Sequence, residues 1–388
     1  MHRCLGVALA ALLPSASFAA DEAITKPIAA LKAVEREGKN NDTVGLAWSG
    51  LVAQGASALI PALEAVDDNN PTSANWLLTA AGAIAEAETK AKRKLPVEKL
   101  LAFVKETKHA ATARGLAFEL LPQAERGQLL AGFLNDPSAD LRRIAVADRL
   151  ESLAKQKPAP KEALEKLLSA ARDQDQVETI AKKLETEHQA KISLAEHFGF
   201  VTHWSIIGPF PSARGKALAV KYAPEEKVTP GEKLKGKEDA EVTWTPIVSR
   251  DKFGMVDFNK LIGKHYDAAA YATAVLAAEK AGPVEIRVTS PNALQVFLNG
   301  KKLFEREEYH HGDSMDYHVG KGQLVAGPNV LVVKICQNNQ KETWAQRWQF
   351  SARACDATGA PLPGVTQLVG ESKIKLGSVP AAATEEKK

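Results

Sequence analysis

The sequence predicts a multidomain α + β protein, in which an N-terminal all-α region precedes a C-terminal antiparallel β-sandwich. From Asp21 to about His197 the chain is rich in Ala, Leu, Glu and Lys, with apolar residues at helical spacing. After Phe198, residues of the Val, Ile, Thr and Trp types recur in short alternating runs bounded by Gly, Pro and Asn, which is typical of strands. We therefore expect a helical domain over 21–198 and a sandwich over 199–360.

The two ends of the chain have other patterns. Residues 1–20 contain a short apolar run and end in the small-residue series around Ser17-Phe18-Ala19, which predicts a secretory signal peptide. We therefore expect an exported protein, periplasmic or extracellular. Residues 361–388 carry Pro, Ala and terminal charges, and we expect this tail to be largely disordered.

Charge excludes some partners. Removal of the signal peptide takes away Arg3 and leaves 49 basic residues against 47 acidic ones. Because the two signs of charge are almost equal in number, the chain has no excess of positive charge that would attract nucleic acid or an anionic membrane surface. No segment of the mature chain is apolar enough to predict a membrane span.

Two cysteines remain in the mature chain, Cys336 and Cys355. If they lie on two strands joined by a tight turn near Asn339-Gln340, each cysteine pairs with a residue roughly ten positions away from the other cysteine. At about 3.3 Å per residue, this offset is too long for a disulfide to span. This geometry predicts two free thiols.

The helical region contains regular breaks and four similar helices. The breaks fall at 38–41, 67–71, 94–96, 135–137, 157–160 and 173–175. One unit, residues 130–150, resembles a HEAT repeat through Asp136, Pro137, Arg142 and Ala145. The resemblance covers about residues 40–185 and implies an α-solenoid in which the Asp-Pro turn ends a helix and the Arg bridges neighbouring turns. Each helix pair is too small to bury its apolar stripe alone and has to stack on the next.

The strand region contains one strong turn signal. Asn299-Gly300 tolerates the positive φ angles of a type I′ turn, so a hairpin is expected over 296–304. Residues 212–240 are expected to form a long surface loop. The predicted strands are 201–207, 242–246, 255–258, 269–278, 284–289, 294–298, 301–305, 316–319, 330–337 and 344–354.

Residues 199–360 resemble the galactose-binding-like jelly-roll domains that accompany family 2 glycoside hydrolases and occur in exported bacterial proteins. The matching blocks are Trp204 to Pro211, Trp244-x-Pro246, Val256-Asp257-Phe258, Ala270-Tyr271-Ala272, Val296 to Lys301, Gly327 to Lys334 and Trp348 to Arg353. The resemblance implies a jelly roll that can bind carbohydrate. The turn 290–293, Ser-Pro-Asn-Ala, departs from the family pattern, which puts any ligand contact there in doubt.

Packing expectations follow from the same blocks. Leu331, Val333 and Ile335 are expected to face the core while Lys334 and Cys336 face outward. Trp204, Trp244 and Trp348 are expected to fill the core rather than to stack on a sugar.

The candidate ligand-binding residues are Tyr309, His310, His311, Asp313 and Trp344. Residues 307–318 form the densest polar cluster, and imidazole is a common metal ligand, but none of the ligand spacings of zinc sites is present. We therefore assign no metal site and no cofactor, and expect a polar loop between strands. Trp344 is expected either to stack on a sugar ring or to cover one end of the core, with Tyr309 or Tyr317 beside it.

Catalytic motifs are absent from the sequence, including Gly-x-Ser-x-Gly, a phosphate loop, His-Glu-x-x-His and Cys-x-x-Cys. The sequence therefore predicts no catalytic residues and a non-enzymatic adaptor, with a protein partner on the helical repeat and carbohydrate or protein on the sandwich. The alternatives are a glycan-acting hydrolase with carboxylates converging in a cleft between the two halves, and a structural spacer in a cell-surface assembly.

Overall fold

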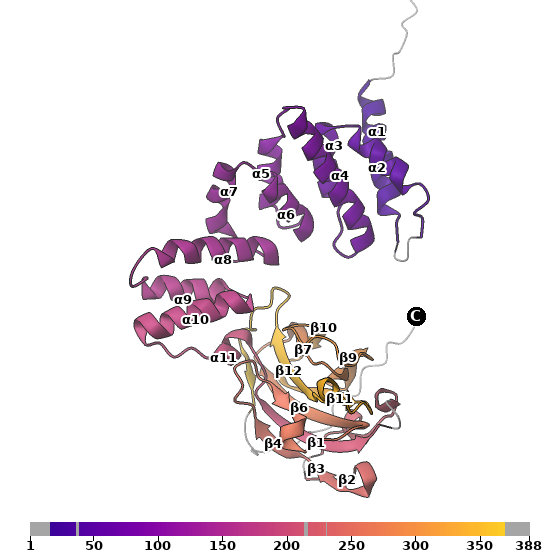
Figure 1. The fold of residues 1–388 in the computed structure, drawn as a ribbon, viewed down its shortest axis with the longest axis vertical. Coiled ribbons are helices and arrows are strands. Elements are labelled where there is room, and N and C mark those ends of the chain that lie inside the picture. Colours follow the sequence, from indigo (N-terminus) through magenta and orange to yellow (C-terminus); the bar gives the residue numbers. More distant parts are fainter. Residues whose placement is uncertain (1–15, 36–38, 213–215, 230, 369–388) are drawn as a thin grey trace, which may run out of the picture. The chain divides into compact units, whose positions relative to one another are not determined.

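The computed structural model describes residues 16–35, 39–212, 216–229 and 231–368 (Figure 1). Helices extend as far as Phe198 and the sheets begin at His203, which confirms the predicted α + β class. The chain forms two compact units that divide between Lys157 and Pro158. The predicted signal peptide and tail lie largely outside the described residues, although α1 already begins at Ala16.

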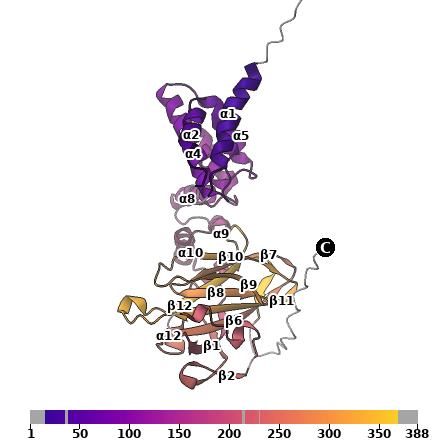
Figure 2. The same cartoon turned by 90° about the vertical axis from the view of Figure 1, so that its right-hand side faces the viewer.

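The first unit is helical. Its helices pack in consecutive pairs, α1 on α2, α3 on α4 and α5 on α6, around one apolar core (Figures 1 and 2). The elements are α1 (Ala16–Lys32), α2 (Val44–Val52), α3 (Ala56–Glu64), α4 (Pro71–Lys90), α5 (Val97–Lys105), α6 (Ala111–Glu119), α7 (Gln123–Leu130), the 3₁₀ turn η2 (Ala131–Phe133) and α8 (Ala139–Ala154). Pairing of this kind agrees with stacked amphipathic helices, and the HEAT label stays a prediction.

The Asp-Pro turn before α8 is built on a buried charge pair. Arg114 of α6, 1% exposed, donates two hydrogen bonds to the Asp136 carboxylate at 2.8 and 2.6 Å and a third to the carbonyl of Val104. Arg142 of α8 donates to the carbonyl of Asp136 at 2.7 Å, which is the bridging contact expected for this arginine. Ser138 caps α8 by accepting from the backbone N–H of Leu141.

The described residues of the second unit contain four α-helices and the sheets. Its helices are α9 (Lys161–Ala170), α10 (Gln174–His188), α11 (Leu194–Phe198) and the short α12 (Phe258–Leu261). Its strands are β1 (His203–Pro211), β2 (Lys233–Lys235), β3 (Glu241–Thr243), β4 (Thr245–Val248), β5 (Val256–Asp257), β6 (Ala268–Ala278), β7 (Gly282–Thr289), β8 (Ala293–Leu298), β9 (Lys301–Arg306), β10 (His318–Leu324), β11 (Gly327–Gln337), β12 (Gln349–Cys355) and β13 (Val365–Gln367).

Two antiparallel sheets enclose the core of this unit. Within the described residues, the larger sheet has seven strands in the order β4-β1-β6-β11-β8-β9, with β13 also paired to β6, and the smaller has the order β10-β7-β12-β5. Leu331, Val333 and Ile335 face this core, as predicted, and so do Trp204 and Trp348. The predicted Asn-Gly hairpin is also present: Asn299 and Gly300 have φ of 52° and 77° between β8 and β9.

The segment 212–240 is not the surface loop that its composition suggested. It includes the 3₁₀ turns η3 (Lys216–Leu218), η4 (Ala223–Glu225) and η5 (Lys237–Asp239), and part of the β2–β3 hairpin. We call the described residues of 216–244 the cover segment, because its apolar side chains and Trp244 pack on the outer face of the larger sheet in a second core. Lys334 and Cys336 do point away from the first core, but the cover segment buries both completely.

Both cysteines are free and buried, which confirms the predicted free thiols. The hairpin assumed for them is wrong. Cys336 lies on β11 in the larger sheet, whereas Cys355 ends β12 in the smaller sheet. They are kept apart by the sandwich rather than by a register offset along one hairpin.

Candidate functional site

The structure brings three of the five candidate ligand-binding residues together. Tyr309 and His310 lie in the loop between β9 and β10, and Trp344 lies in the 3₁₀ turn η6 (Thr343–Ala345) between β11 and β12. The ring centroids of His310 and Trp344 are 5.3 Å apart with the rings perpendicular, and those of Tyr309 and His310 are 6.0 Å apart. We call these three residues the aromatic group.

Trp344 is exposed while its neighbour in the turn is buried. Its side chain is 62% exposed, whereas Ala345 is fully buried and its carbonyl accepts a hydrogen bond from Gln337 at 2.9 Å. Gln346 donates to the carbonyl of Lys341, which ties the turn to the preceding loop. The turn is therefore held by its backbone and presents the indole to solvent. The exposed position argues against the role of covering the core, and stacking on a sugar stays a prediction. The strand predicted over 344–354 begins only at Gln349.

Hydrogen bonds fix His310 in place. Its backbone has a φ of 58°, its N–H donates to the carbonyl of Pro291 at 2.7 Å, and its Nε2 lies 3.0 Å from Oδ1 of Asn338. Because the amide oxygen of Asn338 only accepts, Nε2 carries the proton in this contact. The sequence reasoning missed Asn338, although it stands in the polar run 337–340 that follows a buried strand.

Tyr309 connects the aromatic group to the second core. Its side chain is partly buried against the apolar residues beneath the cover segment. Burial raises the pKa of the Tyr309 phenol, with smaller contributions from neighbouring Cys336 and acidic groups. The hydroxyl is therefore neutral over the physiological pH range.

The other two candidates lie apart from the aromatic group. His311 stacks on Tyr317 with ring centroids 4.4 Å apart, and it contacts His318 of β10. Asp313 forms an ion pair with Arg347 and accepts from Gln349 at 3.3 Å. The candidate residues of this loop therefore fall into separate groups of contacts, although they are neighbours in the sequence.

A charged cluster holds the far end of this loop. Asp316 accepts hydrogen bonds from Arg353, which is 1% exposed, and from Arg287 at 2.9 Å. These arginines favour the ionised carboxylate, so the pKa of Asp316 is lowered although burial opposes the shift. Arg353 also donates to the carbonyls of Phe198 and Gly359. The cluster anchors the loop to β7, β12 and the end of α11.

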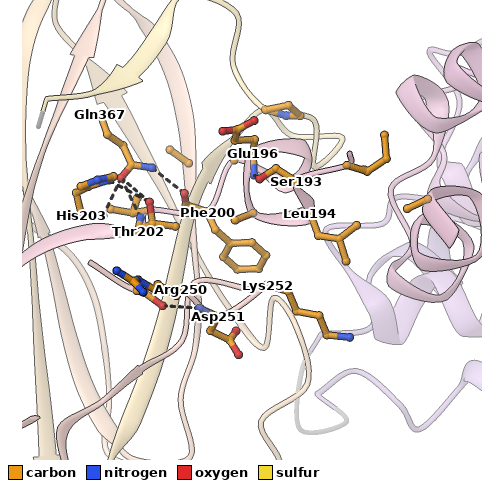
Figure 3. A pocket seen from close by; sticks show the side chains of 18 of the residues that line it. Ser193, Leu194, Glu196, Phe200, Thr202, His203, Arg250, Asp251, Lys252 and Gln367 are labelled. Atoms are coloured by element: carbon orange, nitrogen blue, oxygen red, sulfur yellow. Dashed lines mark hydrogen bonds between the residues drawn. The ribbon is translucent and has the colours of Figure 1, made fainter. Parts of the chain in front are cut away.

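A groove of about 1140 Å³ lies elsewhere in the second unit (Figure 3). It is bounded by α10, the segment 192–203, the loop 249–252 and β13. Gln367 closes one side by accepting from the backbone N–H groups of Thr202 and His203 and donating to the carbonyl of Phe200. Lys252 pairs with Glu178 of α10.

The acidic residues that line this groove are solvated or already engaged. Glu178 is ion-paired, and Asp251 accepts from the backbone N–H groups of Phe253 and Met255. Glu185, Glu196 and Asp251 are exposed. A glycosidase acid needs an environment that raises its pKa, such as an apolar pocket. These four carboxylates are exposed to solvent, ion-paired or hydrogen-bonded to backbone N–H groups.

The described residues lack two further features, a metal-binding cluster and a membrane-spanning helix. They contain no group of three or more His, Cys, Asp or Glu side chains placed to hold a metal ion. None of the helices in those same stretches combines the length and the apolar character of a membrane span.

The similarity of this chain to known proteins is low. No family model matches the chain. No curated protein matches it either. Among solved structures, a β-glucosidase from Kluyveromyces marxianus in complex with glucose is 16% identical with a TM-score of 0.24, and the match covers 42% of this chain and 17% of that one. A family 35 carbohydrate-binding module from an environmental isolate is 15% identical with a TM-score of 0.20, over 30% of this chain and 88% of that one. At these TM-scores neither likeness bears on function.

Proposed function

We propose that this chain is an exported, non-enzymatic binding protein whose sandwich binds carbohydrate at the aromatic group. The observation that supports the proposal is the 62% exposure of Trp344 in a turn that is otherwise anchored. An indole has a broad apolar face that can stack on the C–H face of a sugar ring, and binding removes part of the exposed surface of Trp344 from water. Trp344 does not contribute to the core, so we infer that its exposed indole serves to bind a ligand.

Polar side chains around the indole can form hydrogen bonds with the hydroxyl groups of a sugar. Asn338 lies next to His310, and its amide nitrogen donates to Gln340 at 2.8 Å, so the end of β11 presents a bonded amide network. Lys341 lies over the ring of Tyr266 at 5.9 Å. Sugar hydroxyls need both donors and acceptors, and amide side chains supply both.

The test is a glycan array probed with the purified protein, followed by titration of any hit. Trp344→Ala should weaken binding about tenfold or more, and Trp344→Phe, which keeps a smaller ring, should weaken it less. Tyr317→Ala is the matched control, because Tyr317 is a 45% exposed aromatic residue of the loop between β9 and β10 that stacks on His311 and lies outside the aromatic group. Absence of binding to every glycan, or equal binding by Trp344→Ala, would rule out the carbohydrate role.

The helical unit is proposed to bind a protein partner. A surface groove of about 870 Å³ supports this role, where the α4–α5 turn meets the end of α6. Leu95, Pro96, Val97 and Leu120 line it, and Lys92, Lys94 and Lys99 stand around it. A pull-down with Lys92, Lys94 and Lys99 changed to Glu should lose the partner, while glycan binding stays unchanged.

The hydrolase alternative can be tested at the groove of Figure 3. If catalysis occurred there, Glu178→Gln, Glu185→Gln, Glu196→Gln or Asp251→Asn would abolish turnover of a glycan that the array identifies. We expect no turnover by the unaltered protein, because these carboxylates are exposed to solvent, ion-paired or hydrogen-bonded to backbone N–H groups. A spacer would bind no glycan, and a pull-down from the exported fraction would recover the cell-surface assembly to which it belongs.

A further inference from the structure

His311, a partly buried residue of the loop between β9 and β10, and His318, which begins β10, form a pair of imidazoles that the proposed carbohydrate site does not use. His318, the first residue of β10, is 4% exposed, and its ring centroid lies 5.3 Å from that of His311. The two rings are perpendicular. Within the described part of the chain, Nε2 of His311 and Nε2 of His318 are both buried and neither has a hydrogen-bond partner.

Unpaired buried nitrogens of this kind need an explanation. A buried polar atom without a partner costs about 1–3 kcal/mol, and native proteins contain few of them. Here two such atoms belong to neighbouring rings. A single bound species that accepts both lone pairs would satisfy both nitrogens at once.

The hydrogen bonds of His311 fix which of its nitrogens can bind a metal. Its Nδ1 lies 2.6 Å from the carbonyl oxygen of Gly312. Because a carbonyl only accepts, Nδ1 carries the proton and Nε2 of the neutral ring carries a lone pair. Metal-binding histidines usually donate their second ring N–H to a backbone carbonyl or a carboxylate in this way, which sets the tautomer and the orientation of the ring. Stacking on Tyr317 holds the ring from the other side.

The separation of the rings also fits a shared ion. A tetrahedral ion bonded to two imidazole nitrogens at about 2.0–2.1 Å holds the ring centroids about 5.2 Å apart. The observed separation is 5.3 Å.

From this geometry we propose that His311 and His318 form a two-histidine site for a late first-row divalent cation in tetrahedral or near-tetrahedral coordination, Zn²⁺ by preference with Cu²⁺ as its spectroscopic probe, bound through both Nε2 atoms. Imidazole suits these metals, whereas Mg²⁺ and Ca²⁺ prefer oxygen ligands. The remaining coordination positions are left to water, because the described residues supply no third histidine, cysteine or carboxylate in place. Gly312 and Ser314 are exposed in the same loop, so the route from solvent is short. The sequence reasoning considered only the adjacent pair 310–311 and missed this one, which is seven residues apart.

The experiment titrates the full chain, freed of metal by a chelator, with Cu²⁺ alone and follows electron paramagnetic resonance. We expect one site with hyperfine coupling to two nitrogens, and Zn²⁺ should compete for it. His311→Ala and His318→Ala should each lower the affinity for Cu²⁺ at least about tenfold and reduce the coupling to one nitrogen, in line with losses of 10–100-fold for lesser changes around metal sites.

His310→Ala is the matched control. His310 is the adjacent residue in the sequence, but its Nε2 is already bonded to Asn338, so the variant should bind Cu²⁺ like the unaltered chain. If His318→Ala destabilises the fold, His311→Ala carries the test, because His311 lies in the loop outside both sheets. Retention of two-nitrogen coupling in both variants, absence of stoichiometric Cu²⁺ binding, or loss of binding in His310→Ala would overturn the proposal.

Discussion

Lys334 and Glu225, 109 residues apart in the sequence, form a buried ion pair in which Nζ lies 2.7 Å from Oε1. Lys334 is fully buried, and its ammonium group also donates to the carbonyl of Val220 at 2.7 Å. Tyr271 donates its hydroxyl to the same carboxylate at 2.6 Å, and burial raises the pKa of that phenol. The pair connects the cover segment to the outer face of the larger sheet.

Removal of one member of this pair should destabilise the second unit strongly. Glu225→Ala leaves the Lys334 ammonium buried without its counter-charge, and such changes typically cost about 3–5 kcal/mol. The double variant Glu225→Met with Lys334→Met removes both charges and should recover most of that loss. Urea denaturation followed by tryptophan fluorescence measures the free energy of unfolding. A loss below about 1 kcal/mol in Glu225→Ala would contradict the structural role.

The Asp-Pro turn of the first unit should depend on Asp136. Asp136→Ala leaves the Arg114 guanidinium buried and unpaired, with an expected cost of about 3–5 kcal/mol. Asp140→Ala, an exposed residue in the first turn of α8, should change the free energy of unfolding by no more than about 0.5 kcal/mol. Thermal denaturation followed by circular dichroism at the helix band compares the two. Equal melting temperatures for both variants would mean that the buried pair contributes nothing.

The stability of the second unit should fall as the pH falls through the range in which histidines titrate. The pKa of His318 is lowered to about 4 in the folded state, mainly by burial, with His311 and Arg306 acting in the same direction and Glu308 against it. In the unfolded chain its pKa is about 6.5, so the unfolded state binds the proton first. The contribution of His318 is therefore complete above about pH 6.5 and is lost progressively down to about pH 4.

Urea titrations at a series of pH values between these limits test that dependence. His318→Gln cannot take up a proton, so its stability curve should be flatter than that of the unaltered chain across the same range. His265→Gln is the comparison, because the Nε2 of His265 is already bonded to the carbonyl of Ile262. Parallel curves for His318→Gln and the unaltered chain would exclude His318 as the source.

The two thiols should resist modification in the folded protein. Burial raises the pKa of Cys336 to about 12 and that of Cys355 to about 11. The thiolate is the reactive form, so little of it exists at neutral pH. A disulfide reagent such as dithionitrobenzoate should label both positions only at the rate of unfolding, and rapidly in denaturant. Fast labelling of Cys336 under native conditions would mean that the cover segment opens readily.

Local signals in the sequence were sufficient for many of the elements, although not for those of the cover segment or for β13. The change of period near 198 gave the division between helices and strands, and Asn299-Gly300 gave a hairpin with its turn. Alternation along 330–337 correctly assigned Leu331, Val333 and Ile335 to the core between the sheets. These features depend on residues that are neighbours in the chain, where propensity and period act directly.

Contacts between distant segments could not be obtained in the same way. Lys334 faces outward from the core between the sheets, as expected, but nothing near it in the sequence identifies Glu225 as the partner that buries it. The cysteines were placed on one hairpin because the chain order does not reveal that β11 and β12 lie in different sheets. For the candidate site, the polar loop was found, but its division into an aromatic group and a pair of histidines depends on how the loop folds.

The position of β13 has a consequence for how the sandwich can assemble. This last strand pairs with residues 276–278 of β6, beyond the point where the pairing of β1 begins, and Gln367 holds the entry to β1 through Phe200, Thr202 and His203. The beginning and the end of the sandwich therefore secure each other. A chain shortened before residue 365 would leave residues 276–278 of β6 and the backbone of 200–203 without these partners. The sandwich therefore makes its full set of contacts only when the whole strand region is present.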